Sequence, residues 1–245
     1  MTRYAILSDI HGNLPALEAV VADAEARGCD VFVNLGDILS GPLWPAETAD
    51  YLMQRDWPTI AGNHERQVLT LSINRMGESD LFARKRLNLE QMAWIGNQPA
   101  TLELTDDIFL CHGIPRSDLI HFLFSVDMSG IHDATETEIA ERAGDRTEAL
   151  ILCGHSHIPG ERRFGAGRRV VNPGSVGLQA FHDDHPLPYT VANGDPRARY
   201  AIVEGGNIRF RQVDYDHKSA AMKAEREGRP DWGIGLRLGK MEPTR

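Results

Sequence analysis

The sequence lacks features that would assign it to several other classes of protein. Its 245 residues include only three cysteines, Cys29, Cys111 and Cys153, and a sparse, odd count argues against a disulfide framework. We expect Cys111 and Cys153, which end apolar runs, to be small buried side chains. No apolar run is long enough to cross a bilayer, and no basic flank with an apolar signal segment opens the chain. These absences predict a cytoplasmic protein without a membrane partner.

Positive charge is also scarce, because the formal net charge is −9 at pH 7. An acidic chain has no long-range attraction for nucleic acid or for anionic membranes. A bound metal ion would still supply local positive charge for a nucleotide. Arg66, Arg84, Lys85 and Arg86 could form a basic groove, but such charges are more often a solvated helix face. A long nucleic acid is therefore not expected as a partner.

The first motif lies at the end of the first apolar run. Ala5 to Leu7 reads as a buried strand, and Asp9, His11 and Gly12 follow it. Residues two apart in an extended chain point to the same side, so the carboxylate and the imidazole face one point. The glycine then allows a sharp turn. This combination suits a metal ion, although Asp-x-His alone is common by chance.

The same arrangement recurs along the chain, which makes chance a poor explanation. Polar groups follow five apolar strands, each next to a glycine: Asp9 and His11, Asp37, Asn63 and His64, His112, and His155 and His157. The first half alternates strands and helices, which favours a parallel sheet. In such sheets ligands bind at the carboxyl ends of the strands. We therefore expect these side chains to meet at one sheet edge.

The second half of the chain changes character. Turn signals predict β-hairpins there, most clearly at Gly205-Gly206, between Tyr200–Val203 and Ile208–Val213. Residues 217–227 are predicted to form a helix, and the tail with Trp232 to be frayed. Segment 114–144 is less regular, and it is either a lid over the site or ordinary packing. We find no linker or repeat, so a single domain over 1–245 is expected.

The chemistry of the candidate ligands indicates two metal ions. The set contains oxygen and nitrogen donors without sulfur, which suits manganese, iron, zinc, cobalt or nickel better than calcium or magnesium alone. It also has too many members for one ion. Two divalent ions roughly 3.5 Å apart, sharing one carboxylate, form the centre that is used for phosphoryl displacement. We expect manganese as the first choice among these metals.

Taken together, the motifs resemble those of the calcineurin-like metallophosphoesterases. They are Asp9-x-His11, Gly36-Asp37, Gly62-Asn63-His64-Glu65, His112 and Gly154-His155-Ser156-His157, and their order is the same. Asn172-Pro173-Gly174-Ser175 is similar to the small bacterial phosphodiesterase branch. The resemblance implies an α/β fold of two packed mixed β-sheets flanked by helices. It also implies one metallophosphoesterase domain.

The resemblance further implies a role for each candidate residue. Asp9, His11 and His157 would hold one metal ion, Asn63, His112 and His155 the other, and Asp37 would bridge them. A hydroxide bridging the two metals would attack the phosphorus. His64 would stand beside the substrate phosphate as the catalytic residue and assist the leaving oxygen, or would merely orient a neighbouring carboxylate. His121, His132, His182, His185 and His217 are expected at the surface.

The substrate is left open by the sequence. Asp37 is followed by Ile-Leu-Ser-Gly, not by the Arg-Gly of the protein serine/threonine phosphatases and symmetrical diadenosine tetraphosphatases, which disfavours both. The leading hypothesis is a small phosphodiester or nucleotide as substrate. The alternatives are a phosphomonoesterase, an asymmetrically cleaving dinucleoside polyphosphate hydrolase and a binding scaffold without catalysis. The sequence also leaves open whether the chain forms a homo-oligomer.

Overall fold

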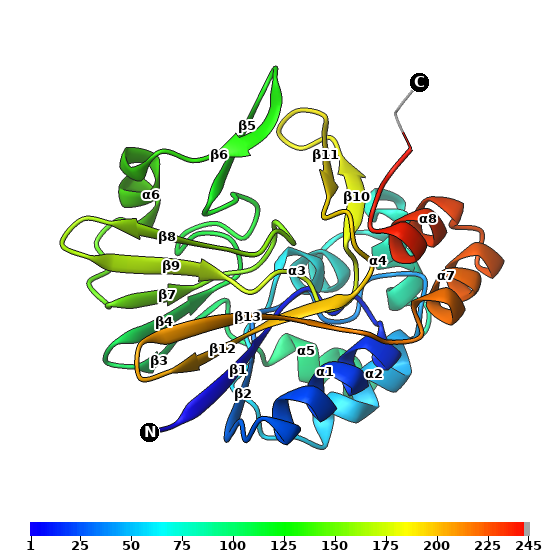
Figure 1. Ribbon diagram of the computed structural model, residues 1–245. Helices are drawn as coiled ribbons and strands as arrows, with labels where there is room; N and C mark the ends of the chain where they lie inside the picture. The colour runs from blue at the N-terminus through cyan, green and yellow to red at the C-terminus, as the bar shows by residue number, and fades with distance from the viewer. Residues whose placement is uncertain (243–245) are drawn as a thin grey trace.

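Two mixed β-sheets pack face to face in the computed structural model of the protein, which describes residues 1–242 (Figure 1). The first sheet has the strand order β13-β12-β1-β2. β1 and β2 are parallel, and the other pairs are antiparallel. Its strands are β1 (Arg3–Leu7), β2 (Val31–Asn34), β12 (Ala198–Glu204) and β13 (Asn207–Val213).

The second sheet has the order β3-β4-β7-β9-β8. β7 lies between β4 and β9 and is parallel to both, whereas the two outer pairs are antiparallel. Its strands are β3 (Thr101–Thr105), β4 (Ile108–Cys111), β7 (Leu150–Leu152), β8 (Gly160–Phe164) and β9 (Arg168–Asn172). β4, which precedes His112, and β7, which precedes His155 and His157, are therefore parallel neighbours that end at one edge.

A hydrophobic layer holds the two sheets together. Ile6 and Val33 from the first sheet pack in one cluster with Leu110, Leu152 and Val171 from the second. All five side chains are fully buried, and burying a side chain of this size contributes about 1.5–3 kcal/mol. The central strands are apolar on both faces because helices or loops cover their outer sides.

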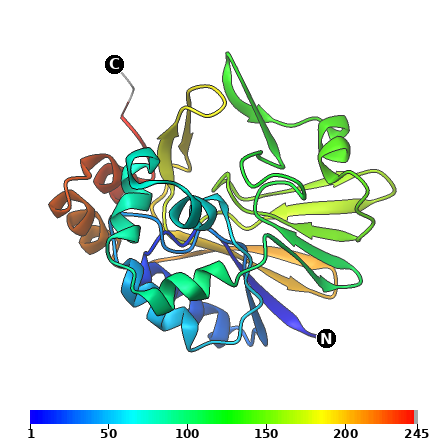
Figure 2. The ribbon, with the colours of Figure 1, turned by 180° about the vertical axis from the view of Figure 1, so that it is seen from behind.

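Helices cover the outer face of the first sheet. The elements are α1 (Leu14–Ala26), α2 (Pro45–Met53), α3 (Asn63–Thr70), η1 (Ile73–Arg75), α4 (Glu78–Arg84) and α5 (Leu89–Gly96). Leu17 and Val20 of α1 pack with Ala5 and Leu7 of β1. Figure 2 shows α3, α4 and α5 together on the side turned away from the viewer of Figure 1. No helix within residues 1–242 is long and apolar enough to span a membrane.

Two small hairpins and one helix complete the second half. β5 (Phe124–Asp127) pairs with β6 (Gly130–Asp133), and β10 (Ala180–Asp183) pairs with β11 (Tyr189–Ala192). Both hairpins project from the same end of the molecule (Figure 1). α6 (Glu136–Ala143) follows β6 and packs Ile139 and Ala143 into a cluster with Phe109 and Ile151 of the second sheet. The expected fold class, two packed mixed sheets flanked by helices, is confirmed.

Several local predictions are also confirmed. The Gly205-Gly206 hairpin joins β12 and β13, and Cys111 and Cys153 are fully buried. The apolar segment before Asn63 and His64 forms less of a strand than expected, because only Thr59 pairs there, through one bridge to Asn34. Strands β5, β6 and β8 were not predicted as such, since their sequences are rich in charged or polar residues.

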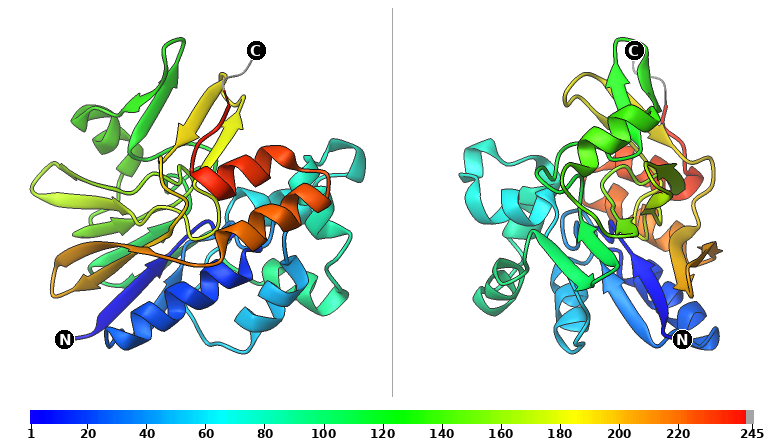
Figure 3. Two further views of the ribbon diagram at one scale, coloured as in Figure 1. Left: turned by 45° about the vertical axis from the view of Figure 1, so that its right-hand side comes forward. Right: turned by 90° about the vertical axis from the view of Figure 1, so that its left-hand side faces the viewer.

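The prediction of a frayed tail is wrong for residues 230–238, which form a helix, whereas its last part, 243–245, lies outside the described residues. α7 (His217–Arg226) is followed by α8 (Pro230–Leu238); α7 lies beside α1, and α8 packs on α7 (Figure 3, left). Gly233 and Gly235 lower the helix propensity of this segment. They also allow close packing, since a Cβ atom on Gly235 would lie 2.5 Å from the carbonyl oxygen of Ala180. Burial of Trp232 and Leu236 against α7 and Leu178 outweighs the weak propensity.

Candidate metal centre

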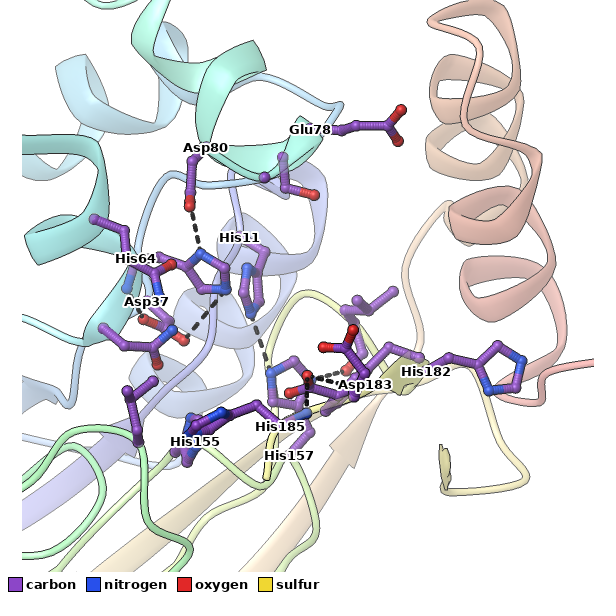
Figure 4. Close-up of a pocket in the computed structure, with 18 of the residues that line it drawn as sticks. His11, Asp37, His64, Glu78, Asp80, His155, His157, His182, Asp183 and His185 are labelled. Atoms are coloured by element: carbon purple, nitrogen blue, oxygen red, sulfur yellow. Dashed lines mark hydrogen bonds and ion pairs between the residues drawn. The ribbon is translucent and has the colours of Figure 1, made fainter. Parts of the chain in front are cut away.

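The seven predicted metal ligands come together where β1, β2, β4 and β7 end and α3 begins. Six of their side chains are buried and His155 is half-buried. Five of the seven line a cavity of about 560 Å³ (Figure 4), namely His11, Asp37, Asn63, His155 and His157. The side chains meet in one place, as expected, but the carboxyl ends of strands from both sheets deliver them there and not the edge of a single sheet. Their assignment as metal ligands stays a prediction.

The backbone at these turns is unusual. Asp9, His11, Asp37, His155 and His157 all have positive φ angles, between 53° and 69°. Asn, Asp and His are the residues other than glycine that enter this left-handed region most readily. The required conformation is therefore one that the ligand residue types tolerate.

The neighbouring glycines explain how the turns approach one another so closely. A Cβ atom on Gly36 would lie 2.4 Å from the amide nitrogen of Gly62, and one on Gly62 would lie 2.2 Å from Oδ1 of Asp37. A Cβ atom on Gly154 would lie 2.0 Å from Oγ of Ser8. Real Cβ atoms do not approach this closely, so these glycines are needed for steric reasons.

The donor atoms fall into two groups that each suit one cation. Atoms of Asp9, His11 and His157 lie within 4.8 Å of one another, and so do atoms of Asp37, His112 and His155. Asn63 lies beside the second group, because its neighbour His64 donates its backbone N–H to Asp37 Oδ1 at 3.0 Å. Oδ1 of Asn63 and Oδ2 of Asp9 are buried without a hydrogen-bond partner among the described residues. Such atoms are costly unless a ligand satisfies them.

The histidine rings give the strongest indication that cations fit here. Nδ1 of His11 lies 2.7 Å from the carbonyl oxygen of Ser40, and Nδ1 of His157 lies 2.7 Å from that of Leu178. A carbonyl accepts only, so each Nδ1 carries the proton and each Nε2 presents a lone pair. The two Nε2 atoms lie 3.1 Å apart. Two lone pairs that face each other in a buried site are favourable only around a shared cation.

Burial sets the protonation of these rings. It lowers the pKa of His11 to about 4, although Asp37 opposes the shift. Burial and the neighbouring His112 lower the pKa of His155 to about 4 as well. Both rings are thus neutral at pH 7, which is the form that binds a metal ion.

The surroundings shift the pKa values of Asp9 and Asp37 in opposite directions. Burial raises the pKa of Asp9 to about 7, with His112 opposing. Asp37 is equally buried, yet His112 and His64 hold its pKa well below the usual range, and Nε2 of His112 lies 3.1 Å from Asp37 Oδ2. Asp37 therefore stays ionised between the two groups of donors.

His64 stands at the side of the site and is half-buried. Its Nδ1 lies 2.6 Å from Asp80 Oδ1, and its Nε2 lies 3.9 Å from Asp37 Oδ2 (Figure 4). Its side chain is 26% exposed. Burial would lower the pKa of His64, but Asp37 and Asp80 raise it to about 10. A protonated imidazole therefore faces the cavity.

The comparison with known proteins agrees with this geometry. The profile of the calcineurin-like phosphoesterase superfamily domain matches residues 2–195. The chain belongs to the calcineurin-like phosphoesterase superfamily. This membership indicates a hydrolase of phosphate esters, and the resemblance that was inferred from the motifs is confirmed.

Several relatives match this chain over almost its whole length. An uncharacterized protein of Methanocaldococcus jannaschii is 27% identical, over 96% of each chain. A metallophosphoesterase from Sphaerobacter thermophilus has a TM-score of 0.76 at 25% identity and covers 97% of this chain, which covers 99% of it. A hypothetical protein from Pyrococcus horikoshii has a TM-score of 0.77 at 19% identity, over 99% and 100% of the two chains.

Some residues of the candidate site were not predicted. Asp80 of α4 binds His64 and also accepts a hydrogen bond from Ser40 at 2.6 Å. Trp232 of α8 contacts His11 edge-on, with 5.8 Å between ring centroids. No local pattern marks either residue, because each reaches the site from a separate helix.

The expectation that His121 is a surface residue is wrong. It is only 5% exposed, and its ring stacks on His155 with 4.6 Å between centroids. Its Nε2 lies 3.0 Å from the hydroxyl of Tyr189, which fixes the ring between segment 114–144 and β11. His132, His182 and His185 are exposed as predicted, and His217 is half-buried. His182 and His185 also line the cavity.

Proposed function

We propose that this phosphoesterase hydrolyses a small phosphodiester or nucleotide with the help of two divalent metal ions. The observation that supports the proposal is the pair of donor groups on the floor of an open cavity. Every predicted ligand is present and lies within one of the two groups or beside it. A protein that served only as a binding scaffold would have no need for this complete set.

We assign Asp9, His11 and His157 to one cation and Asn63, His112 and His155 to the other. Asp37 would contact both, since it faces donors of each group. Oxygen and neutral imidazole donors fit manganese, iron, zinc, cobalt or nickel, and manganese is our first choice. When bound, such a pair of cations lowers the pKa of water and offsets the charge of a phosphate ester.

We propose that His64 assists the departure of the leaving group of the ester. Its Nδ1 is held by Asp80, so the ring is oriented and its Nε2 points toward Asp37 and the cavity (Figure 4). A protonated Nε2 donates its proton, or a hydrogen bond, to the oxygen that departs from phosphorus. Asp80 keeps the imidazolium form stable during this step.

We also propose that segment 114–144 covers one side of the cavity within a single domain over 1–245. Leu119 from this segment lines the cavity, and His121 stacks on His155. Assembly into a homo-oligomer and a cytoplasmic location stay predictions.

The proposal is tested by hydrolysis assays with three substrates side by side. Metal-loaded protein is incubated with a chromogenic phosphodiester, a phosphomonoester and a dinucleoside polyphosphate, and product release is followed with and without a chelator. We expect the diester to be cleaved fastest, with two metal ions per chain and full loss of activity on chelation. Faster cleavage of either other substrate would change the assignment to a phosphomonoesterase or a dinucleoside polyphosphate hydrolase. Two bound metals without turnover would indicate a scaffold.

A further inference from the structure

His155 differs from the other three predicted histidine ligands in how its ring is held. Nδ1 of each of the others lies 2.7 or 2.8 Å from a backbone carbonyl oxygen in the turns that follow β2 and β9. For His155 the backbone partner is Leu119, and the ring of His121 stacks on it with 4.6 Å between centroids. Both supports come from segment 114–144, which lies outside the two large sheets. The position of His155 therefore depends on how that segment is fixed.

Tyr189 of β11 supplies the hydrogen bond that fixes His121. Nε2 of His121 lies 3.0 Å from the Tyr189 hydroxyl, whereas Nδ1 of His121 is buried without a partner among the described residues. The orientation of this ring thus depends on one hydrogen bond within residues 1–242. The two residues are only 5% and 6% exposed, so water is poorly placed to replace the hydroxyl group.

Asp183 determines the direction of this hydrogen bond. The Tyr189 hydroxyl donates to Asp183 Oδ2 at 3.0 Å, because a carboxylate only accepts. The phenolic oxygen then accepts from the Nε2–H group of His121. Asp183 lines the cavity (Figure 4), and its Oδ1 accepts from the backbone N–H groups of the next two residues, at 2.7 and 3.1 Å. A directed chain of hydrogen bonds therefore runs from the β10–β11 hairpin to the ring that lies on His155.

We propose that Tyr189 is a positioning residue for the metal ion that His155 is predicted to bind. Its hydroxyl group holds His121 on the His155 ring, and so keeps that ring in the orientation in which it binds. This inference rests on the proposed function, because it assigns a role toward a bound metal ion. Loss of a residue that orients a ligating histidine typically costs about 10–100-fold in metal affinity. Since Tyr189 acts through a further side chain, we expect the lower end of that range.

The inference is tested by calorimetric titration of chelator-treated protein with manganese. We expect two ions per wild-type chain. Tyr189→Phe removes only the hydroxyl group and keeps the ring, which packs edge-on against Phe181 with 6.3 Å between centroids. This variant should weaken one of the two ions about tenfold and leave the other unchanged. In a His155→Ala background, Tyr189→Phe should cause no further loss of affinity, because the ring that it helps to position is absent.

Tyr200→Phe is the matched control. Tyr200 is fully buried, and its hydroxyl group also donates to a carboxylate oxygen, Asp23 Oδ2, at 2.7 Å. Neither of these two residues lines the cavity. The control variant therefore loses the same kind of hydrogen bond away from the metal centre. It should lower the temperature of unfolding but change the affinity for neither ion.

Wild-type affinity for both ions in Tyr189→Phe, or equal weakening by Tyr189→Phe and Tyr200→Phe, would overturn this inference and leave the proposed function intact. A further loss in the His155→Ala background would overturn it as well, since Tyr189 would then act on the fold. A wild-type chain that binds fewer than two ions would contradict the proposed function and this inference together. If Tyr189→Phe does not fold, His121→Phe is titrated with the same expectation, because it keeps a flat ring on His155 without the hydrogen bond.

Discussion

Nδ1 of His64 lies 2.6 Å from Oδ1 of Asp80, although the two residues belong to different helices, α3 and α4. The pair resembles a catalytic histidine with its orienting carboxylate, in which the acid fixes the ring and favours its protonated form. Asp80 is 2% exposed, so its charge acts on His64 with little screening by water. The first two predictions test this arrangement.

Replacing the carboxylate should lower turnover without removing the metals. Asp80→Asn keeps the size of the side chain but removes the charge that stabilises protonated His64. We expect kcat to fall about 10–100-fold, as is typical when the partner of a catalytic or ligating histidine is lost. Steady-state kinetics and metal analysis check this outcome. Glu78→Gln, an exposed cavity residue on the same helix, is the control. A parallel loss of metal would show that Asp80 supports the fold of the centre instead.

Removal of the imidazole itself should have a larger effect. His64→Ala is expected to retain both metals and to lose about 10²–10⁴-fold in kcat, the range for a general acid. His132→Ala, an exposed histidine on β6, should leave both quantities unchanged. Release of metal from His64→Ala would contradict the assigned role and make His64 a ligand.

Asp37 should be essential for both metal ions. Its carboxylate lies between the two donor groups, so Asp37→Ala is expected to weaken metal binding more than about 100-fold. Elemental analysis after gel filtration measures the metal content, and addition of manganese to chelated wild-type protein should restore activity. Asp184→Ala removes another carboxylate of the cavity and should keep both metals. Retention of one metal in Asp37→Ala would show that the two sites are separate.

Trp232 should contribute strongly to stability. It is 7% exposed and packs in a cluster with Leu43 and Leu178. Trp232→Ala is expected to lower the free energy of unfolding by about 3–5 kcal/mol, measured by urea denaturation. Leu238→Ala, at a position 51% exposed, should change it by less than about 0.5 kcal/mol. If Trp232→Ala and Leu238→Ala change the free energy of unfolding by the same small amount, α8 is not packed against the rest of the protein in solution.

The sequence predicted the parts of the molecule that have a local signature. The Asp-x-His motif after an apolar strand located Asp9 and His11, and the glycine next to each motif indicated a sharp turn. Thr135-x-x-Glu138 is another local signature, since it forms the capping box of α6, in which both reciprocal hydrogen bonds are present. In each case the information lies within a few residues of the chain.

The features that the sequence did not predict depend on contacts between distant segments. α8 contains two glycines, and only its packing against α7 and β10 makes it a helix. Asp80 approaches His64 because α4 folds back toward α3. No periodic pattern in the sequence predicts this contact. His121 is buried because Tyr189, 68 positions later, provides a hydrogen-bond partner. Tertiary packing determines these features, and no local pattern in a single sequence predicts that packing.

The left-handed torsions at Asp9, His11, Asp37, His155 and His157 limit how this centre could be redesigned. A designer who wishes to retune its metal preference would choose cysteine or glutamate, but these residue types enter that region less readily than Asn, Asp or His. Each exchange would add a conformational penalty of about 1–2 kcal/mol to any change in coordination chemistry. Among residues with a metal-binding side chain, only Asn, Asp and His avoid this penalty. The backbone conformation therefore limits which residue types can serve as ligands at this site.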